Sequence, residues 1–321
     1  MSARTVSLAL AILCILAGAL SLYVGPADLL ALADSRPDLA RTILWEIRVP
    51  RTLLCVLVGA VLGASGAALQ GLLRNPLASP DILGTSAGGA LGAVAAAYFL
   101  GAGGAIGSTL GGMAGAALAL ALLLLLAGRG AATTTLILAG VAISALAAAL
   151  MNLALALAPS PFALYDIIFW LLGSFEDRTP GQLFLGAPFM IAGLAGLLFC
   201  APALGRLALG EDVAETLGVS VKIVRLAIVI ASGIAVGAAV SLAGAVGFIG
   251  LVVPHLVRPL LDERPGAAIL PSALGGGALL TLADLISRIP VDGRTLPIGV
   301  ITALVGAPFF LALILRRRSV R

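Results

Sequence analysis

The sequence predicts an all-α polytopic membrane protein with about ten transmembrane helices. Of the 321 residues, 61% are hydrophobic and only 11% are charged, a balance typical of chains that cross a bilayer repeatedly. Uncharged runs of about 20 residues, the length that spans the hydrocarbon core, recur from one end of the sequence to the other. The 40 glycines and 17 prolines indicate helices that pack closely and are often interrupted.

The first predicted span covers residues 5–24, after a short basic start. This run is longer than the apolar core of a signal peptide, so we favour an uncleaved first helix over a cleaved leader. Residues 25–47 are more polar. They are expected to form an external connection with a short helix over 37–46.

The second predicted span covers residues 52–73 and follows the sequence RVPR at 48–51. Pro50 suits the first turn of a helix, where its missing N–H costs nothing. The helix is expected to end near Arg74, because the residues just beyond it stand before prolines and are pushed out of the α region.

A non-helical bend is therefore expected after the second span, and it carries Asn75, Ser79 and Asp81. Irregular backbone at membrane depth is tolerated only where it is buried in protein or lines a water-filled cavity. The bend is a candidate lining for a pathway.

The remaining spans follow the uncharged runs. Glycines at 103, 107, 111 and 115 repeat every four residues and predict a close helix contact. A short apolar piece within 166–178 is too brief to span, and we place it as an interfacial helix. The third to tenth spans are predicted at 82–100, 104–128, 133–157, 183–204, 226–243, a short helix ending at 257, 267–286 and 296–315, with a tight turn at Gly244, Gly247 and Gly250 between the seventh and eighth.

Ten spans place both termini on one side of the membrane. With that side taken as the cytoplasm, 12 of the 19 basic residues lie inside, as the positive-inside rule prefers. The predicted location is the cell (inner) membrane, with both termini cytoplasmic. Arg4, Arg74, Arg129, Arg206, Lys222, Arg225, Arg258, Arg264, Arg316, Arg317, Arg318 and Arg321 form the inner set.

Few side chains could couple transport to an ion. Asp284 is the one acidic residue well inside a predicted span, and Arg288 stands one helical turn beyond it. A structural ion pair is favoured over a proton carrier. His255 follows Pro254 without a nearby second ligand, so a capping or bend-stabilising role is favoured over metal binding. The three cysteines fit no metal-site spacing.

The sequence contains no nucleotide-binding phosphate loop, because its one lysine, Lys222, follows Ser220 and Val221. If ATP drives this protein, the ATPase is another chain. We expect no enzymatic activity and no cofactor in this chain. The scattered arginines and few aromatic residues also argue against nucleic-acid binding.

One charged segment, 207–221, is a candidate docking site for such an ATPase. It is interpreted as two short helices split at Gly218, with an apolar stripe of Leu209, Val213 and Leu217 at a spacing of four. The alternative is an ordinary solvated loop. Docking is favoured because an apolar stripe without a partner would be exposed to water.

Several motifs together resemble the FecCD-type permeases, the membrane subunits of ABC importers for iron–siderophores, heme and vitamin B12. The resemblance covers almost the whole chain and implies one transmembrane permease domain, 1–321, with the type II ABC importer permease fold. The motifs are RVPR at 48–51, GASGAALQGLLRNPLASPDILG at 63–84, WLLGS at 170–174, ALGEDVAETLGV at 208–219, GFIGLVVPHLVR at 247–258, ADLISR at 283–288 and LPIGVITALVGAPFF at 296–310.

The resemblance also implies roles for particular residues. Arg48 and Arg288 look like external arginines that meet acidic residues of a binding protein, although a pair with Asp284 would weaken that role for Arg288. The two cytoplasmic gates are implied at Asn75, Leu77, Thr133 and Thr134. Coupling helices within about 205–222 are implied to enter the ATPase through Leu209, Gly210, Glu211, Asp212, Val213, Ala214, Leu217 and Gly218, of which 212–218 resembles the common ABC-permease motif only loosely.

The implied partners are a second permease subunit (identical or different), a cytoplasmic ATPase that uses ATP-Mg, and a periplasmic or lipid-anchored substrate-binding protein. The sequence RNPLASPDILG leans toward an iron(III)–siderophore cargo, with heme or cobalamin as alternatives. From other classes, an ion-coupled secondary transporter and a membrane scaffold remain open.

Overall fold

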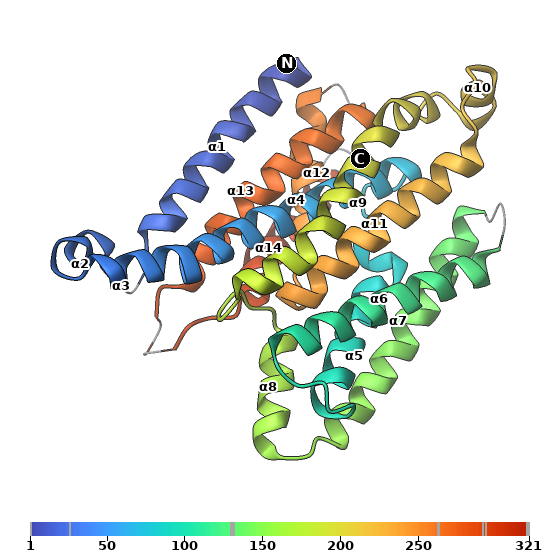
Figure 1. The fold of residues 1–321 in the computed structure, drawn as a ribbon. Coiled ribbons are helices and arrows are strands. Elements are labelled where there is room, and N and C mark those ends of the chain that lie inside the picture. Colours follow the sequence, from blue (N-terminus) through green and yellow to red (C-terminus); the bar gives the residue numbers. More distant parts are fainter. Residues whose placement is uncertain are drawn as a thin grey trace.

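The structure, a computed structural model, describes residues 2–25, 27–128, 132–261, 264–290, 292 and 294–318. Within these ranges the fold is all-α (Figure 1). The longer helices are α1 (Ala3–Tyr23), α4 (Val49–Leu72), α5 (Thr85–Tyr98), α6 (Ala105–Ala127), α7 (Thr133–Ala156), α9 (Pro180–Leu207), α11 (Val221–Ala243), α13 (Ile269–Ser287) and α14 (Ile298–Arg318). The shorter ones are α2 (Leu29–Ser35), α3 (Pro37–Thr42), α8 (Pro161–Leu171), α10 (Glu211–Thr216), α12 (Ile249–Val257) and the turns η1 (Ile43–Arg48), η2 (Pro80–Leu83), η3 (Arg258–Leu261) and η4 (Gly266–Ala268).

The ten predicted spans correspond, in order, to α1, α4, α5, α6, α7, α9, α11, α12, α13 and α14. Within the described residues, seven helical segments are long and apolar enough to cross a membrane. The others are shorter: α5 has 14 residues, α12 has nine, and the apolar part of α14 runs over Ile298–Leu311. The prediction of a polytopic helical membrane fold is confirmed.

Helix α4 forms the centre of the molecule and is buried along most of its length. It packs against α9, α11, α12 and α13. Glycines allow the backbones to approach: a Cβ on Gly59 would lie 2.3 Å from the Gly276 carbonyl oxygen, and one on Gly66 would lie 1.9 Å from that of Gly250. Close backbone contact of this kind is how helices associate where the solvent is as apolar as the side chains.

The expected break between a short helix and the second span is absent. Helix α3 continues through η1, a π-helical turn, directly into α4, so that residues 37–72 form one helical segment. Pro50 explains the π turn. Proline lacks an N–H and its ring clashes with the carbonyl four residues back, and the wider turn before Pro50 accommodates both effects.

Helices α5 and α6 pack through the predicted glycine strip. A Cβ on Gly92 would meet the Gly111 carbonyl oxygen at 2.3 Å, and one on Gly115 would meet that of Gly88 at 2.3 Å. This pair is the most extensively contacting pair of helices in the described fold. The close contact predicted from the four-residue repeat is confirmed.

Two connecting helices differ from the sequence-based expectation. Helix α8, the predicted interfacial piece, begins earlier than expected because Ser160 caps it by accepting a hydrogen bond from the Ala163 N–H. Helix α2 was not expected. Asp28 caps it by accepting hydrogen bonds from the Leu30 and Ala31 N–H groups, a local signal typical of a helix start.

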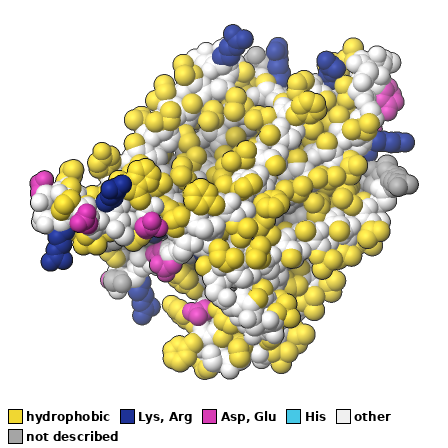
Figure 2. Space-filling view, in the orientation of Figure 1, with side chains coloured by type: hydrophobic (Ala, Val, Ile, Leu, Met, Phe, Trp, Pro, Cys, Tyr) yellow, Lys and Arg dark blue, Asp and Glu magenta, His cyan; other side chains and the backbone are white. Residues whose placement is uncertain are grey.

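The surface separates into a hydrophobic band and two charged ends (Figure 2). Charged side chains gather along the upper right and lower left edges of this view, and the surface between them is mostly hydrophobic. The upper right edge contains α10, and α2 and α3 lie at the left edge (Figure 1). We call the end that contains α10 the α10 end. The opposite end, which contains α2, α3 and α8, is called the α8 end. A band of this kind is what a bilayer covers.

Candidate functional site

The bend after α4 lies at the α10 end and forms as predicted. Leu73 ends the helix and Arg74 adopts a φ of 47°, which turns the chain away from the helix axis. The Asn75 side-chain oxygen accepts a hydrogen bond of 2.9 Å from the Leu77 N–H, which closes a tight turn. The side chains of Asn75 and Leu77 are exposed.

Helix α7 packs directly against this bend. A Cβ on Gly140 would lie 1.8 Å from the Ile82 carbonyl oxygen, so the two backbones are in contact there. The predicted gate residues Thr133 and Thr134 form the first turn of α7, where Thr133 is partly buried and Thr134 is exposed. The structure thus joins the two elements that carry the predicted gate.

The predicted docking segment also lies at the α10 end. Leu209, Val213 and Leu217 are 65%, 44% and 50% exposed, so the apolar stripe faces outward. Ala214, on the opposite side of α10, is fully buried against the core. Gly210 and Gly218, which flank α10, have φ angles of 120° and 79°, conformations that favour glycine.

The expectation of two short helices in this segment is wrong. Only α10 forms, and the chain beyond Gly218 passes through Val219 into α11. Val219 is 5% exposed and packs into the core, so the chain has no free length for a second surface helix. Outside the apolar stripe, Glu211 forms a salt bridge of 3.0 Å with Arg225 at the start of α11.

An ion cluster occupies the α8 end. The Asp284 carboxylate is 1% exposed and accepts hydrogen bonds from two arginines, at 2.9 Å from Arg51 and 2.6 Å from Arg288. The predicted Asp284–Arg288 pair is confirmed. Arg51 is a second partner that sequence reasoning missed, because it is 233 residues away in the chain. The two guanidinium groups offset part of the cost of burying this carboxylate.

The same end holds the carboxyl terminus of α1 through two arginines. Arg48 donates to the carbonyl oxygens of Leu22 and Tyr23 at 2.8 and 2.6 Å and also to that of Ala27. Arg288 donates to the carbonyl oxygens of Ser21 and Val24, each at 2.8 Å. The last carbonyls of a helix have no partner within the helix, and its end carries partial negative charge, so both guanidinium groups stabilise it.

This arrangement bears on the predicted docking role of the two arginines. Arg48 is 5% exposed and the Arg288 side chain is 6% exposed, and both guanidinium groups already have acceptors. Docking of a binding protein at Arg48 and Arg288 stays a prediction. A carboxylate arriving there would meet arginines held rigidly by α1.

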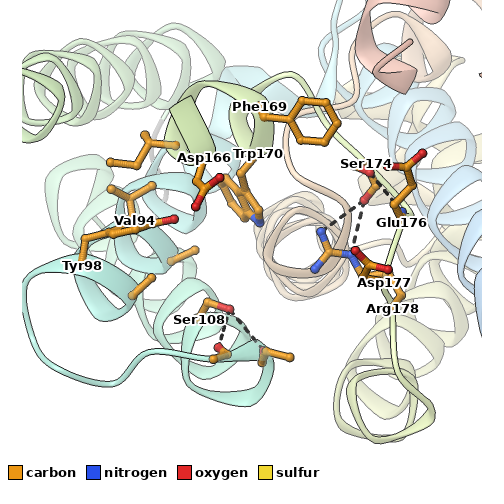
Figure 3. A pocket seen from close by; sticks show the side chains of 15 residues that line it. Val94, Tyr98, Ser108, Asp166, Phe169, Trp170, Ser174, Glu176, Asp177 and Arg178 are labelled. Atoms are coloured by element: carbon orange, nitrogen blue, oxygen red, sulfur yellow. Dashed lines mark hydrogen bonds between the residues drawn. The ribbon is translucent and has the colours of Figure 1, made fainter. Parts of the chain in front are cut away.

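A pocket of about 500 Å³ opens at the α8 end between α5, α6, α8 and the segment that follows α8 (Figure 3). Tyr98 and Asp166 point toward one another at one side of it. On the other side, Arg178 donates to the Ser174 carbonyl oxygen at 3.3 and 3.4 Å. Burial lowers the pKa of Arg178, and the neighbouring Asp177 carboxylate partly offsets that effect.

Residues 172–174, which follow α8 at this pocket, are held by main-chain hydrogen bonds to two other helices. The Ser174 N–H donates to the Ala243 carbonyl oxygen at the end of α11, at 2.9 Å. The N–H groups of Ile298 and Gly299, at the start of α14, donate to Gly173 and Leu172 at 3.1 and 3.0 Å. The pocket was not predicted, since its lining comes from distant parts of the chain.

His255 lies near the end of α12, with its ring edge-on to Phe309 of α14 at a centroid distance of 5.8 Å. Among the described residues, no group of three or more potential metal ligands comes together. The histidine thus contributes to the contact between α12 and α14.

The described helices form the bundle of a multi-pass membrane protein, with an exposed apolar stripe at one end and a polar pocket at the other. The chain belongs to the FecCD transport family, whose model matches residues 6–316. Its fold is that of the type II ABC importer permeases.

Relatives in this family include two described as vitamin B12 or cobalamin permeases. The vitamin B12 import system permease protein BtuC of Salmonella typhi is 42% identical over 317 residues, 96% of this chain and 94% of that protein. The cobalamin import system permease protein BtuC of Halobacterium salinarum is 39% identical, covering 89% of this chain and 76% of its own.

Solved structures show the same fold. A metal-chelate type ABC transporter in an inward-facing conformation matches with a TM-score of 0.85 and 31% identity, covering 98% of this chain and 99% of that one. PsaBC from Streptococcus pneumoniae matches with a TM-score of 0.51 and 17% identity, a likeness of fold alone.

Proposed function

We propose that this chain is the permease subunit of an ABC importer that carries a corrinoid of the vitamin B12 type. The observation that carries the importer assignment is the exposed apolar stripe of α10, because a stripe at one end of a membrane protein fits a groove on a soluble partner. The corrinoid assignment rests on the cobalamin permeases among its relatives. An iron–siderophore, toward which the sequence leaned, is the alternative cargo, and the 31% identity to a metal-chelate type ABC transporter is compatible with it.

The working assembly is a dimer of permease subunits, identical or different. An ATPase that hydrolyses ATP-Mg docks on each α10, and a periplasmic or lipid-anchored binding protein docks at the α8 end. The α10 end is then the cytoplasmic side of the inner membrane, with both termini there. The predicted excess of basic residues on that side supports this orientation.

The pathway in this proposal begins at the polar pocket beside α8 and ends at the bend after α4. The pocket offers carboxylates, hydroxyl groups and aromatic rings to a large chelate. The bend supplies Asn75 and Leu77, and the start of α7 supplies Thr133 and Thr134, as the gate at the other end. The backbone contact between Gly140 and Ile82 couples movement of α7 to the bend.

The substrate is tested in proteoliposomes that contain the permease with its ATPase and its binding protein. We expect ATP-dependent uptake of cyanocobalamin, with competition by other corrinoids. A ferric hydroxamate siderophore and heme, presented in the same way, serve as controls. Uptake of the siderophore without uptake of cyanocobalamin would restore the iron assignment and contradict ours.

The importer assignment has a separate readout. Uptake of any of these chelates that requires hydrolysable ATP supports the assembly, whichever chelate is carried. Uptake that follows a proton or sodium gradient without ATP would instead favour the secondary transporter.

A further inference from the structure

An apolar groove runs along the outside of the bundle between α6 and α11. Near the α10 end it has a volume of about 800 Å³, and Leu136 of α7 contributes to its wall. A second hollow of about 570 Å³ continues it toward the middle of the same two helices. The two hollows share Ala121 and Leu124, so they form one groove.

The groove is long enough for an acyl chain. On α11 it extends from Lys222 to Ala238, a length of about 24 Å at about 1.5 Å per residue. One leaflet contributes about half of the roughly 30 Å hydrocarbon core. The groove is therefore longer than the hydrocarbon depth of one leaflet, so it can hold an acyl chain that reaches the bilayer middle.

The charges lie at one end of the groove only. Lys222 and Arg225, in the first two turns of α11, line its mouth at the α10 end. Arg225 also pairs with Glu211, whereas no carboxylate of the described residues lies within salt-bridge distance of Lys222. Ser220 makes no side-chain cap, so the N-terminal N–H groups of α11 add positive potential at the same point.

The lining favours a lipid over a loop of protein. Apart from Lys222 and Arg225, the walls of the part near the α10 end consist of Ala, Leu, Ile, Val and Gly side chains. A protein loop would bring main-chain N–H and C=O groups into this groove without hydrogen-bond partners, which is strongly unfavourable in lipid. An acyl chain carries no such groups, and its phosphate would lie beside the two cations.

We propose that the groove between α6 and α11 binds an anionic phospholipid of the leaflet at the α10 end. The phosphate lies beside Lys222 and Arg225, and one acyl chain lies along Leu124 and Ala121. The site is separate from the docking stripe, the gate and the pocket at α8. It adds a structural lipid that supports the base of α7, since Leu136 forms part of the same wall.

The test is native mass spectrometry of the full-length protein titrated with phosphatidylglycerol or phosphatidylcholine of identical acyl chains. We expect phosphatidylglycerol to bind at least fivefold more tightly. A charge near the headgroups contributes about a fivefold factor, so Lys222→Gln should lose about that much affinity for phosphatidylglycerol and little for phosphatidylcholine. Arg206→Gln removes an exposed charge that does not line the groove and should bind as the wild type does.

A second variant tests the acyl chain. Ala121→Phe fills the groove at the residue that both hollows share, and should weaken binding of both lipids. Leu118→Phe is the matched control, because Leu118 is 62% exposed on the same helix and does not line the groove. Ala121 is also exposed, so the fold should tolerate this change.

Equal binding of the two lipids, or an unchanged preference in Lys222→Gln, would overturn the proposal. So would lipid binding that is lost whenever two permease chains associate, because a second copy would then occupy the groove. Loss of the preference in Lys222→Gln together with weaker binding in Ala121→Phe supports it.

Discussion

At the scale of single residues, the charged groups that matter most are buried and held by several partners. Asp284 lies between Arg51 and Arg288, and Arg288 also reaches the end of α1. The surface pair of Arg225 and Glu211 differs from this cluster, because the Glu211 side chain is 56% exposed. Removal of one partner should therefore cost more stability in the Asp284 cluster than in the pair of Arg225 and Glu211.

We expect Asp284→Asn to destabilise the protein by about 3–5 kcal/mol, because it leaves two guanidinium groups without a counter-charge. Glu211→Gln is the matched control. It should cost no more than about 1 kcal/mol, the usual value of an exposed pair. Thermal unfolding in detergent measures both, and equal midpoints for the two variants would contradict the assignment of Asp284 as the central anion.

A substitution of Arg48 can show whether this residue docks the substrate-binding protein or only anchors α1. Arg48→Glu should weaken binding of the substrate-binding protein at least tenfold, because a carboxylate would face the partner's acids where an arginine had paired with them. An acid-to-arginine change on the partner should recover part of the affinity. If Arg48 only anchors α1, the variant will lose thermal stability while its docking affinity, measured by surface plasmon resonance, stays that of the wild type.

At the scale of helices and turns, close backbone contacts decide how the elements meet. Gly140 against Ile82 joins α7 to the bend, and α10, which carries the middle of the exposed apolar stripe, lies between two glycines with positive φ. The contact between Gly140 and Ile82 leaves no room for a side chain at position 140. The apolar stripe, by contrast, is exposed and can be reached by a partner.

Gly140→Ala should push the bend away from α7, because the new methyl group would overlap the Ile82 carbonyl oxygen. With Asn75→Cys as reporter in a cysteine-free background, a water-soluble maleimide should label faster and transport should fall. Gly205→Ala is the control, since a Cβ there meets nothing within 4 Å. The same labelling rate in both variants would mean that the contact does not position the bend.

If the apolar stripe at α10 docks on the ATPase, charged substitutions in the stripe should abolish ATPase binding. Leu209→Asp with Leu217→Asp would place unpaired charges in a packed groove, at a cost of several kcal/mol. Co-purification of the ATPase should fall more than tenfold while the permease still inserts. Glu215→Gln, also on α10, should keep it. Wild-type co-purification by the double variant would leave α10 as a solvated connection.

The spans were predictable from sequence because each is an uncharged run bounded by charges or prolines, as at Pro50 and Arg74. Two kinds of feature were not. The π turn before Pro50 depends on continuity with α3, which the polar composition of that region concealed. The link between Arg51 and Asp284 depends on how α4 packs on α13, for which neither residue carries a local signal.

At the scale of the whole molecule, two ends with different chemistry face each other across a hydrophobic band. The α8 end carries the ion cluster and the polar pocket, and the α10 end carries the bend and the exposed apolar stripe. Transport requires that events at one end change the other. The packing of α7 on the bend is the described contact that best fits this role.

Cysteines at Asn75 and Thr134, in a background lacking Cys14, Cys55 and Cys200, test this coupling in the assembled dimer. We expect disulfide formation between subunits in the nucleotide-free state and a changed yield with a non-hydrolysable ATP analogue. The measurement is the fraction of crosslinked dimer on a non-reducing gel. The same fraction of crosslinked dimer with and without the ATP analogue would indicate that these residues have a purely structural role.

The arginines that hold α1 have a consequence for how this chain can vary in evolution. Arg48 and Arg288 recognise main-chain oxygens at Leu22, Tyr23 and Val24, and every amino acid supplies such an oxygen. Drift in the identity of those three residues should be tolerated so long as the helix end keeps its shape. The two arginines have no such freedom. A saturation library should show that most substitutions are tolerated at positions 22–24 and that few are tolerated at positions 48 and 288.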